Sequence, residues 1–324
     1  MAADCNSLNN AGAWYNSSGV AQPVTLANGA TISPGSALGS GTWANLYVAC
    51  GNSVAPLRPF VGFGSISLVD QGANSNYNAL QVSARRSAGA LDLNLAYTWS
   101  HSLDNASDRY DGSFVNSYCM ACNYASSNFD QTQMLSLAWV YHLPLMAQNR
   151  WLGGWEWSGI MTLDTGTPFS VTNGVFGDNA GVANGQGTGS RADLVGNPTA
   201  VSGNPNAVSA AEIAAGDVGT ITGPMLYNPQ AFAEPTGLTF GNSGRNLLRN
   251  PGRANFDMGV FKQFRVTERQ SVQFRAEAFN VFNHTQFNGV NSNFGAYGAS
   301  EVNVFRPGGA HLGRVIQFGL KWAF

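Results

Sequence analysis

Two cysteines three residues apart are the most reactive pair of side chains in the sequence. Cys119 and Cys122 form the motif "CMAC", and Cys5 and Cys50 are the other two cysteines. Such a pair can exchange disulfides, bind a metal ion or close a small loop. A redox motif needs a βαβ context and a zinc site needs a second pair of ligands, and the sequence has neither. The motif therefore favours a structural disulfide between Cys119 and Cys122, formed in an oxidising compartment.

The four histidines are the next candidates for chemistry, but no nucleophile pattern surrounds them. They lie in loops or at the ends of predicted strands: His101, His142, His284 and His311. The sequence also lacks the G-x-S-x-G, H-E-x-x-H and P-loop motifs. We therefore expect no catalytic residue, no cofactor and no metal site, and a protein that is not an enzyme.

The elements that carry these residues must be built from an unusual composition. Charged residues make up 10% of the 324 residues, against about 25% in an ordinary soluble domain. The net charge is −2, which gives no electrostatic reason to expect a nucleic-acid partner. No apolar run approaches the roughly 18 residues of a membrane-spanning helix.

Almost all periodic segments repeat every two residues, which is the period of a β-strand. We expect eight strands, at residues 60–70, 77–86, 91–100, 131–141, 154–164, 255–266, 271–282 and 314–324. Trp, Tyr and Phe occur on the apolar faces near strand ends, whereas charged residues occupy the middle of the opposite faces. The strands are also long enough to cross a bilayer. These features predict an all-β fold, an antiparallel transmembrane β-barrel segment of about eight long strands.

The connections between the predicted strands alternate in length. Tight links lie at 87–89 and 267–270, a moderate one at 142–153, and long ones at 102–130, 165–254 and 283–313. The link at 71–76, between the first two strands, is the one that is short out of turn. Short turns on one side and long extracellular loops on the other are typical of outer-membrane barrels. We expect an irregular segment at 1–58 and a barrel portion at 59–324. Within it, 165–254 is rich in Gly, Asn, Ser and Pro and is expected to be a surface loop with little core of its own.

In a barrel, the polar face of each strand points into the lumen. The residues expected there line a solute path or form a solvated network, and they are Arg85, Asp92, Glu156, Arg275, Glu277 and Lys321. Lys262 falls on the apolar face near a short turn, so we expect it to extend to the membrane interface.

Several segments resemble the C-terminal half of the barrel in Oar-like TonB-dependent outer-membrane transporters. They include "NSNYNALQVSARR", "LNLAYTWSHSLDN", "DTGTPFSV", "GRNLLRNPGRANFDMGVFKQFRV" and "RQSVQFRAEAFNVFNHTQFN". The last strand is similar to the signal that the barrel assembly machinery reads, an aromatic final residue with alternating apolar residues before it. By that resemblance the assembly signal comprises Phe318, Leu320, Trp322 and Phe324.

The resemblance implies a C-terminal portion of a larger transporter in the bacterial outer membrane. Its partners would be outer-membrane lipids, the assembly machinery and an unknown solute. The TonB complex would be engaged only through N-terminal parts that the sequence does not contain: a signal peptide, a TonB box, a regulatory-like domain and a plug.

Two alternatives remain open from the sequence. One is a self-contained small barrel that acts as a pore or adhesin. The other is a soluble β-rich binding module, in which the Trp and Phe rows form a buried core. Pairing between the first and last strands would favour the small barrel.

Overall fold

The computed structural model describes residues 22–25, 31–32, 37–38, 41–42, 71–108, 119–144, 149, 151–172, 191–201, 223–233, 241–293 and 304–324. The predicted strand at 60–70 and most of the segment 1–58 lie outside these residues. Within that segment, the described residues form two short pairs: β1 (Val24–Thr25) with β2 (Thr31–Ile32), and β3 (Ala37–Leu38) with β4 (Gly41–Thr42).

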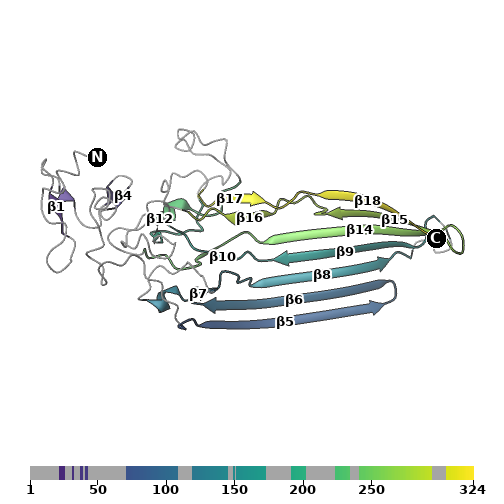
Figure 1. Ribbon diagram of the computed structural model, residues 1–324, viewed down its shortest axis with the longest axis horizontal. Coiled ribbons are helices and arrows are strands. Elements are labelled where there is room, and N and C mark those ends of the chain that lie inside the picture. The colour runs from purple at the N-terminus through teal and green to yellow at the C-terminus, as the bar shows by residue number, and fades with distance from the viewer. Residues whose placement is uncertain are drawn as a thin grey trace, which may run out of the picture.

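One antiparallel sheet dominates the fold (Figure 1). Its long strands are β5 (Ser75–Ala88), β6 (Leu91–Asp104), β8 (Gln133–His142), β9 (Trp155–Asp164), β14 (Arg253–Arg265), β15 (Ser271–Phe279) and β18 (Val315–Ala323). They follow one another across the sheet in chain order, and the short β7 (Ala125–Ser126) pairs with the end of β6. Each of the seven predicted segments within the described part of the chain overlaps one of these long strands, which confirms the all-β prediction.

The strands are joined by short turns at one end and long loops at the other, as predicted (Figure 1). The tightest turn joins β5 to β6 through Gly89 and Ala90. Gly89 has a φ of 68°, a left-handed conformation that glycine adopts without a steric penalty. The strands of the three hairpins therefore run back along one another, and every long loop emerges at the opposite end.

The register sorts the side chains into two faces. One continuous row across four strands consists of Leu95, Leu137, Met161 and Phe256. The neighbouring row, on the other side of the sheet, consists of Arg85, Asn94, Ala138, Ile160 and Asp257. We call these two sides the apolar face and the polar face. Because the side-chain period is two, a slip of one residue would exchange them along a whole strand.

Many apolar side chains of the apolar face are exposed in the described part of the chain. Phe318, Leu320 and Trp322 on β18 are 74%, 76% and 64% exposed. Aromatic rings meet near the turns, where Trp155 contacts Phe274 with centroids 6.3 Å apart. Near the loops, Phe256 contacts Phe282 at 5.0 Å. A continuous exposed apolar surface with aromatic rings at both ends is the pattern of a lipid-facing barrel wall.

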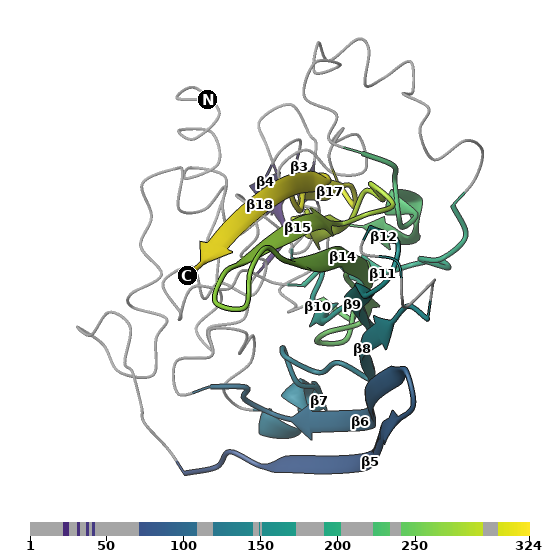
Figure 2. The same ribbon diagram turned by 90° about the vertical axis from the view of Figure 1, so that its right-hand side faces the viewer.

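The sheet bends into an arc that stays open within the described residues. Seen along the strands, β5 and β18 lie at opposite ends of the arc (Figure 2). β5 pairs only with β6, and β18 pairs only with β15. Each therefore has one edge of backbone groups that no described strand pairs with, and such edges are a template for further strands.

The buried apolar core lies in the loops, which corrects the expectation that the long loop has little core of its own. All buried hydrophobic residues among those described belong to the loops beyond the strand ends: Val171, Ala192, Ala231, Phe232, Leu248, Val304 and Phe305. A barrel wall faces lipid on one side and lumen on the other, so its side chains have no protein layer to pack against. The loops do, since three of them meet at the same end of the sheet.

We call the described parts of these three loops, within 105–132, 165–252 and 280–314, the cap. Short elements tie it together: η2 (Met120–Asn123), β10 (Pro168–Phe169), β11 (Asp193–Leu194), η4 (Pro229–Ala231), β12 (Phe232–Ala233), β13 (Leu248–Arg249), β16 (Phe287–Val290) and β17 (Pro307–Ala310). β10 pairs with β13, and β11 with β12. Tyr227 contacts both Phe169 and Phe305, at 6.0 and 6.1 Å, so the second and third loops share one core.

Candidate functional site

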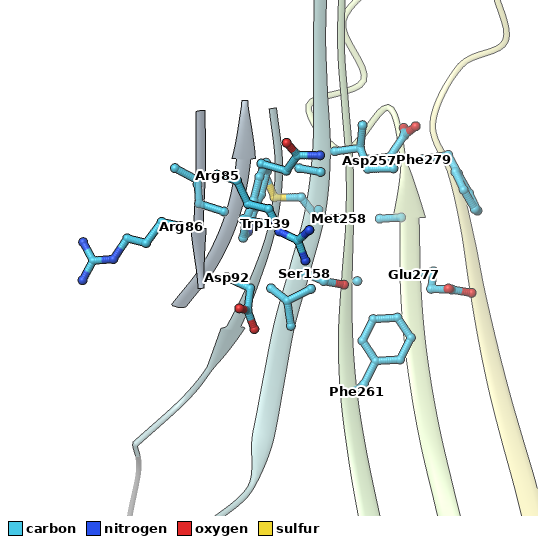
Figure 3. A pocket seen from close by; sticks show the side chains of 18 residues that line it. Arg85, Arg86, Asp92, Trp139, Ser158, Asp257, Met258, Phe261, Glu277 and Phe279 are labelled. Atoms are coloured by element: carbon cyan, nitrogen blue, oxygen red, sulfur yellow. The ribbon is translucent and has the colours of Figure 1, made fainter. Parts of the chain in front are cut away.

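A hollow of about 660 Å³ lies against the polar face, between the turns and the cap. Strands β5, β6, β8, β9, β14 and β15 all contribute to its lining (Figure 3). Because the hollow lies on this side, the polar face is the concave one. Its volume is in the range of small-molecule sites, which are usually concave and mainly apolar with a few placed polar groups.

The middle of the hollow is apolar and its two sides are charged. Ala138, Val140 and Ile160 come from the central strands β8 and β9 and form the floor. Arg85 lies on the β5 side, where it is paired in register with Asn94. Asp257 lies across the sheet on β14, at the other end of the same row. Arg85 and Asp257 therefore flank an apolar strip from opposite sides, and Asp92 on β6 adds a carboxylate on the Arg85 side.

The carboxylates on the β14–β15 side are held in place by neutral donors. Asp257 accepts hydrogen bonds from the Asn280 backbone amide and from Asn255 Nδ2, both at 2.9 Å. Glu277 accepts one from Gln317 Nε2 at 2.6 Å. Within the described part of the chain, no basic side chain forms an ion pair with either carboxylate. These donors orient the two negative charges without neutralising them.

The register places all six residues predicted for the lumen on the polar face. They pair as Arg85 with Asn94, Asp92 with Val140, Glu156 with Phe261, Arg275 with Gly319, Glu277 with Gln317 and Lys321 with Gln273. Arg85, Asp92 and Glu277 line the hollow. Glu156, Arg275 and Lys321 do not line it.

Two of the predicted lumen residues outside the hollow, Glu156 and Arg275, have local partners near the turns. His142 lies 3.6 Å from Glu156 and 3.9 Å from Asp92. Arg275 donates to Gln273 and lies over the Phe261 ring, with its guanidinium carbon 5.9 Å from the centroid. These contacts form a polar network between the hollow and the turns.

Lys262 lies on the apolar face at the turn end, as expected, but its side chain does not extend into solvent. It is 5% exposed, and its ammonium donates to the Gly153 carbonyl in the β8–β9 turn. The Phe264 ring lies 5.3 Å away. The turn folds over the side chain and supplies a carbonyl in place of water, so the ammonium lies at the turn end of the wall without being exposed.

The sequence did not predict the polar contacts that connect the loops of the cap. The segment 241–253, here called the strap, carries an arginine at every fourth position: Arg245, Arg249 and Arg253. That spacing is a signal, because 165–254 has only one other arginine, Arg191. Arg245 and Arg249 contact the first loop and Arg253 contacts the third, so the strap, which belongs to the second loop, connects the three loops of the cap.

Arg245 is 3% exposed and is surrounded by the first loop. Its Nη1 donates to Asp104 Oδ1 at 2.7 Å, and its Nη2 donates to Ser107 Oγ at 2.7 Å and to Asn128 Oδ1 at 3.1 Å. A planar guanidinium can satisfy several acceptors at once, which a lysine ammonium cannot do in the same geometry. Arg253 reaches the third loop through Gln286, with Nε 3.0 Å from Oε1.

Arg249 joins the strap to Asp130. Its Nη2 lies 2.6 Å from Asp130 Oδ2, while Ser102 N and His101 Nδ1 contact the same carboxylate at 2.8 and 3.1 Å. Burial raises the pKa of Asp130. The hydrogen bonds from Arg249, Ser102 and His101 outweigh that effect, so the pKa lies below its ordinary value of 3.8.

The pKa of Arg191, also in the cap, is lowered. Burial, and then the nearby charge of Arg245, bring it down to about 10. Its Nη2 donates to Asn123 Oδ1 at 2.7 Å, and the Asn123 carbonyl accepts from Arg245 at 3.3 Å. One asparagine thus bridges two guanidinium groups in the interior of the cap.

The remaining predicted sites lie at opposite ends of the fold. Cys119 and Cys122 form a disulfide next to η2, with their Cα atoms 5.3 Å apart. Phe318, Leu320 and Trp322 lie on the apolar face of β18, opposite Ala276, Phe274 and Val272. Phe324 follows the strand and is 98% exposed.

Two further kinds of site are absent from the described residues. No helix there is long and apolar enough to cross a membrane. No group of three or more His, Cys, Asp or Glu side chains is arranged to hold a metal ion there.

Comparison with known families gives one match across most of the chain. A family model described as an outer membrane beta barrel domain matches residues 11–317. No curated protein and no solved structure matches the chain.

Proposed function

Given that the chain belongs to the outer membrane beta barrel domain family, we propose that it forms part of the wall of an Oar-like TonB-dependent transporter, which takes up a solute. The family places the protein in the bacterial outer membrane, so its exposed apolar face contacts lipid there. Transport, dependence on TonB and membership of the Oar-like group are the parts that we propose.

The observation that supports this function best is the open arc. Its long strands run in chain order from β5 to β18, and these two strands lie at opposite ends of the sheet (Figure 2). In hydrocarbon, a free strand edge leaves backbone groups without hydrogen bonds, so the arc must be completed by further strands. A wall with more strands encloses a wider lumen, which suits passage of a bulky solute.

The cap supports a selective transporter over an open pore. It is a packed structure at the loop end of the wall, with its own apolar core and the strap as its connector. A solute that enters from the loop side would meet this cap before it meets the hollow.

The first experiment tests whether the arc closes on itself. Cysteine pairs are placed along β5 and β18, for example Gln81→Cys with Lys321→Cys, and oxidised in outer membranes. The positive control is Ser271→Cys with Ala323→Cys, two positions that are paired in register between β15 and β18. We expect the control to cross-link and the β5–β18 series not to do so. Efficient cross-linking between β5 and β18 would instead show a small closed barrel.

The second experiment tests transport. The natural gene is expressed in a Gram-negative host that lacks general porins, with and without TonB. Uptake is measured for labelled solutes too large for passive diffusion. We expect uptake above the empty-vector level only in cells with TonB. Equal uptake in both hosts would indicate a passive pore, and no uptake in either would contradict the transporter proposal.

A further inference from the structure

We propose that the hollow binds a short zwitterionic peptide with an apolar middle, laid across the strands. Its amino terminus faces Asp257 and Glu277, its carboxylate faces Arg85, and its side chains cover the floor. This inference rests on the proposed transport function, because it names the solute class for the same lumen. Figure 3 shows Asp257 and Glu277 on the side of the hollow opposite Arg85, and a third acidic residue, Asp92, on the same side as Arg85.

The floor selects for an apolar middle. Ile160 is 52% exposed, although it lies on the concave face among polar neighbours. Ala138 and Val140 lie beside it on β8, and both line the hollow. When a ligand covers apolar side chains that face water, the free energy of the complex falls, because apolar surface is removed from water. A purely polar solute would leave this strip exposed.

The charges select for a zwitterion. The acidic side carries two oriented carboxylates that have no basic partner within the described residues. On the opposite side, Arg85 is exposed and has no acidic partner among those residues. The next residue, Arg86, also borders the hollow, but it pairs in register with Leu93 on the apolar face and its side chain is directed away from the other lining residues (Figure 3). A ligand with separated opposite charges matches both sides of the hollow.

The spacing sets the length of the ligand. Arg85 and Asp257 occupy the ends of one row that crosses β5, β6, β8, β9 and β14. Neighbouring strands lie about 4.8 Å apart, so the row measures about 19 Å along the sheet. An extended chain advances about 3.3 Å per residue, which corresponds to five or six residues. The volume of about 660 Å³ is consistent with a peptide of that size whose side chains are small.

The test uses the full chain, purified from outer membranes in detergent. The probe is a pentapeptide of alternating leucine and alanine with free termini, and its binding is measured by calorimetry. Three modified probes accompany it: one acetylated at the amino terminus, one amidated at the carboxyl terminus and one with both changes. We expect saturable binding of the free peptide and about tenfold weaker binding after either single modification, since each removes a charge-assisted hydrogen bond.

Variants of the lining residues test which side of the hollow binds which terminus of the peptide. Asp257→Asn with Glu277→Gln is expected to weaken the free peptide about tenfold and to leave the acetylated peptide unchanged. Arg85→Gln is expected to weaken the free and acetylated peptides but not the amidated one. The matched controls are Arg269→Gln and Glu268→Gln, which remove one charge of each sign from the exposed β14–β15 turn, away from the hollow. Both should bind the free peptide like the wild type.

The results separate this inference from the proposed function. Equal affinity for free and doubly modified peptides would overturn the assignment of the two charged sides. If the protein supports TonB-dependent uptake of other solutes but shows no saturable binding of the peptide, only the assignment of a peptide ligand is overturned. Failure of uptake in the transport experiment would contradict the proposed function itself, whatever the peptide result.

Discussion

The guanidinium of Arg249 lies 2.6 Å from the carboxylate of Asp130, although 119 residues separate them in the chain. The contact joins the strap to the first loop of the cap. The Asp130 side chain is 1% exposed, whereas that of Arg249 is 33% exposed. Removal of one partner of such a pair strongly lowers the free energy of unfolding, because it leaves a buried charge without a compensating charge.

Replacement of Arg249 by alanine should therefore destabilise the cap. We expect a loss of about 2–3 kcal/mol, at the lower end for a buried pair, since Ser102 and His101 still contact the carboxylate. Hydrogen exchange of the cap amides would measure this loss. Arg269→Ala, which removes an exposed arginine from the β14–β15 turn, is the control and should leave exchange unchanged. Equal exchange rates in both variants would contradict the role given to the strap.

Because of the Asp130 carboxylate, we expect the cap to become less stable in acid. The pKa of folded Asp130 is lowered from 3.8, so the unfolded chain takes up a proton at a higher pH than the folded one. This contribution to stability is present above pH 3.8 and is lost as the pH falls through the lowered pKa. The difference in free energy of unfolding between the wild type and Asp130→Asn should shrink below about pH 4. A difference that stays constant from pH 6 to pH 3 would argue against it.

Two glycines in the wall should respond differently to alanine. A Cβ at Gly159 would overlap the Trp139 ring and lie 2.8 Å from the Asp257 carbonyl, whereas a Cβ at Gly319 would meet only Arg275, at 3.7 Å. Gly159→Ala must displace Trp139 on the lipid face, and we expect it to cost about 1–3 kcal/mol. Gly319→Ala should be tolerated. Urea unfolding in detergent, followed by tryptophan fluorescence, would compare the two variants.

Adjacent residues of β18 test which face contacts lipid. Phe318 lies on the apolar face opposite Ala276, and Gln317 lies on the polar face opposite Glu277. Arginine at position 318 should destabilise the protein in lipid vesicles by about 2–4 kcal/mol near the bilayer midplane. Arginine at position 317 should cost much less, because it remains in the lumen beside a carboxylate. Similar losses for both variants would show that the faces are assigned wrongly.

The sequence was sufficient to predict the wall. Strand positions followed from a two-residue period sustained over long segments, as in Leu91–Tyr97, and this signal is local. The lengths of the connections predicted which strand ends carry turns and which carry loops. The polar faces could be identified for the same reason, since alternate residues must point to opposite sides of any strand.

The cap was predicted poorly, because its contacts are not local. Arg245 pairs with Asp104 across 141 residues, and Val171 packs with residues far along the chain. A loop rich in Gly, Asn and Ser has no periodicity that would identify its few buried side chains. The strap arginines were visible as a repeat, but their partners were not.

The amino-acid sequence by itself determined that this chain forms a membrane-facing β wall, since period, strand length and aromatic placement are properties of single strands. Only the tertiary structure decided which residues share a site. Arg85 and Asp257 come to flank one hollow because the register of four strand pairings places them in the same row, and sequence spacing does not contain that register. Likewise, Lys262 meets the Gly153 carbonyl because the β8–β9 turn folds over it.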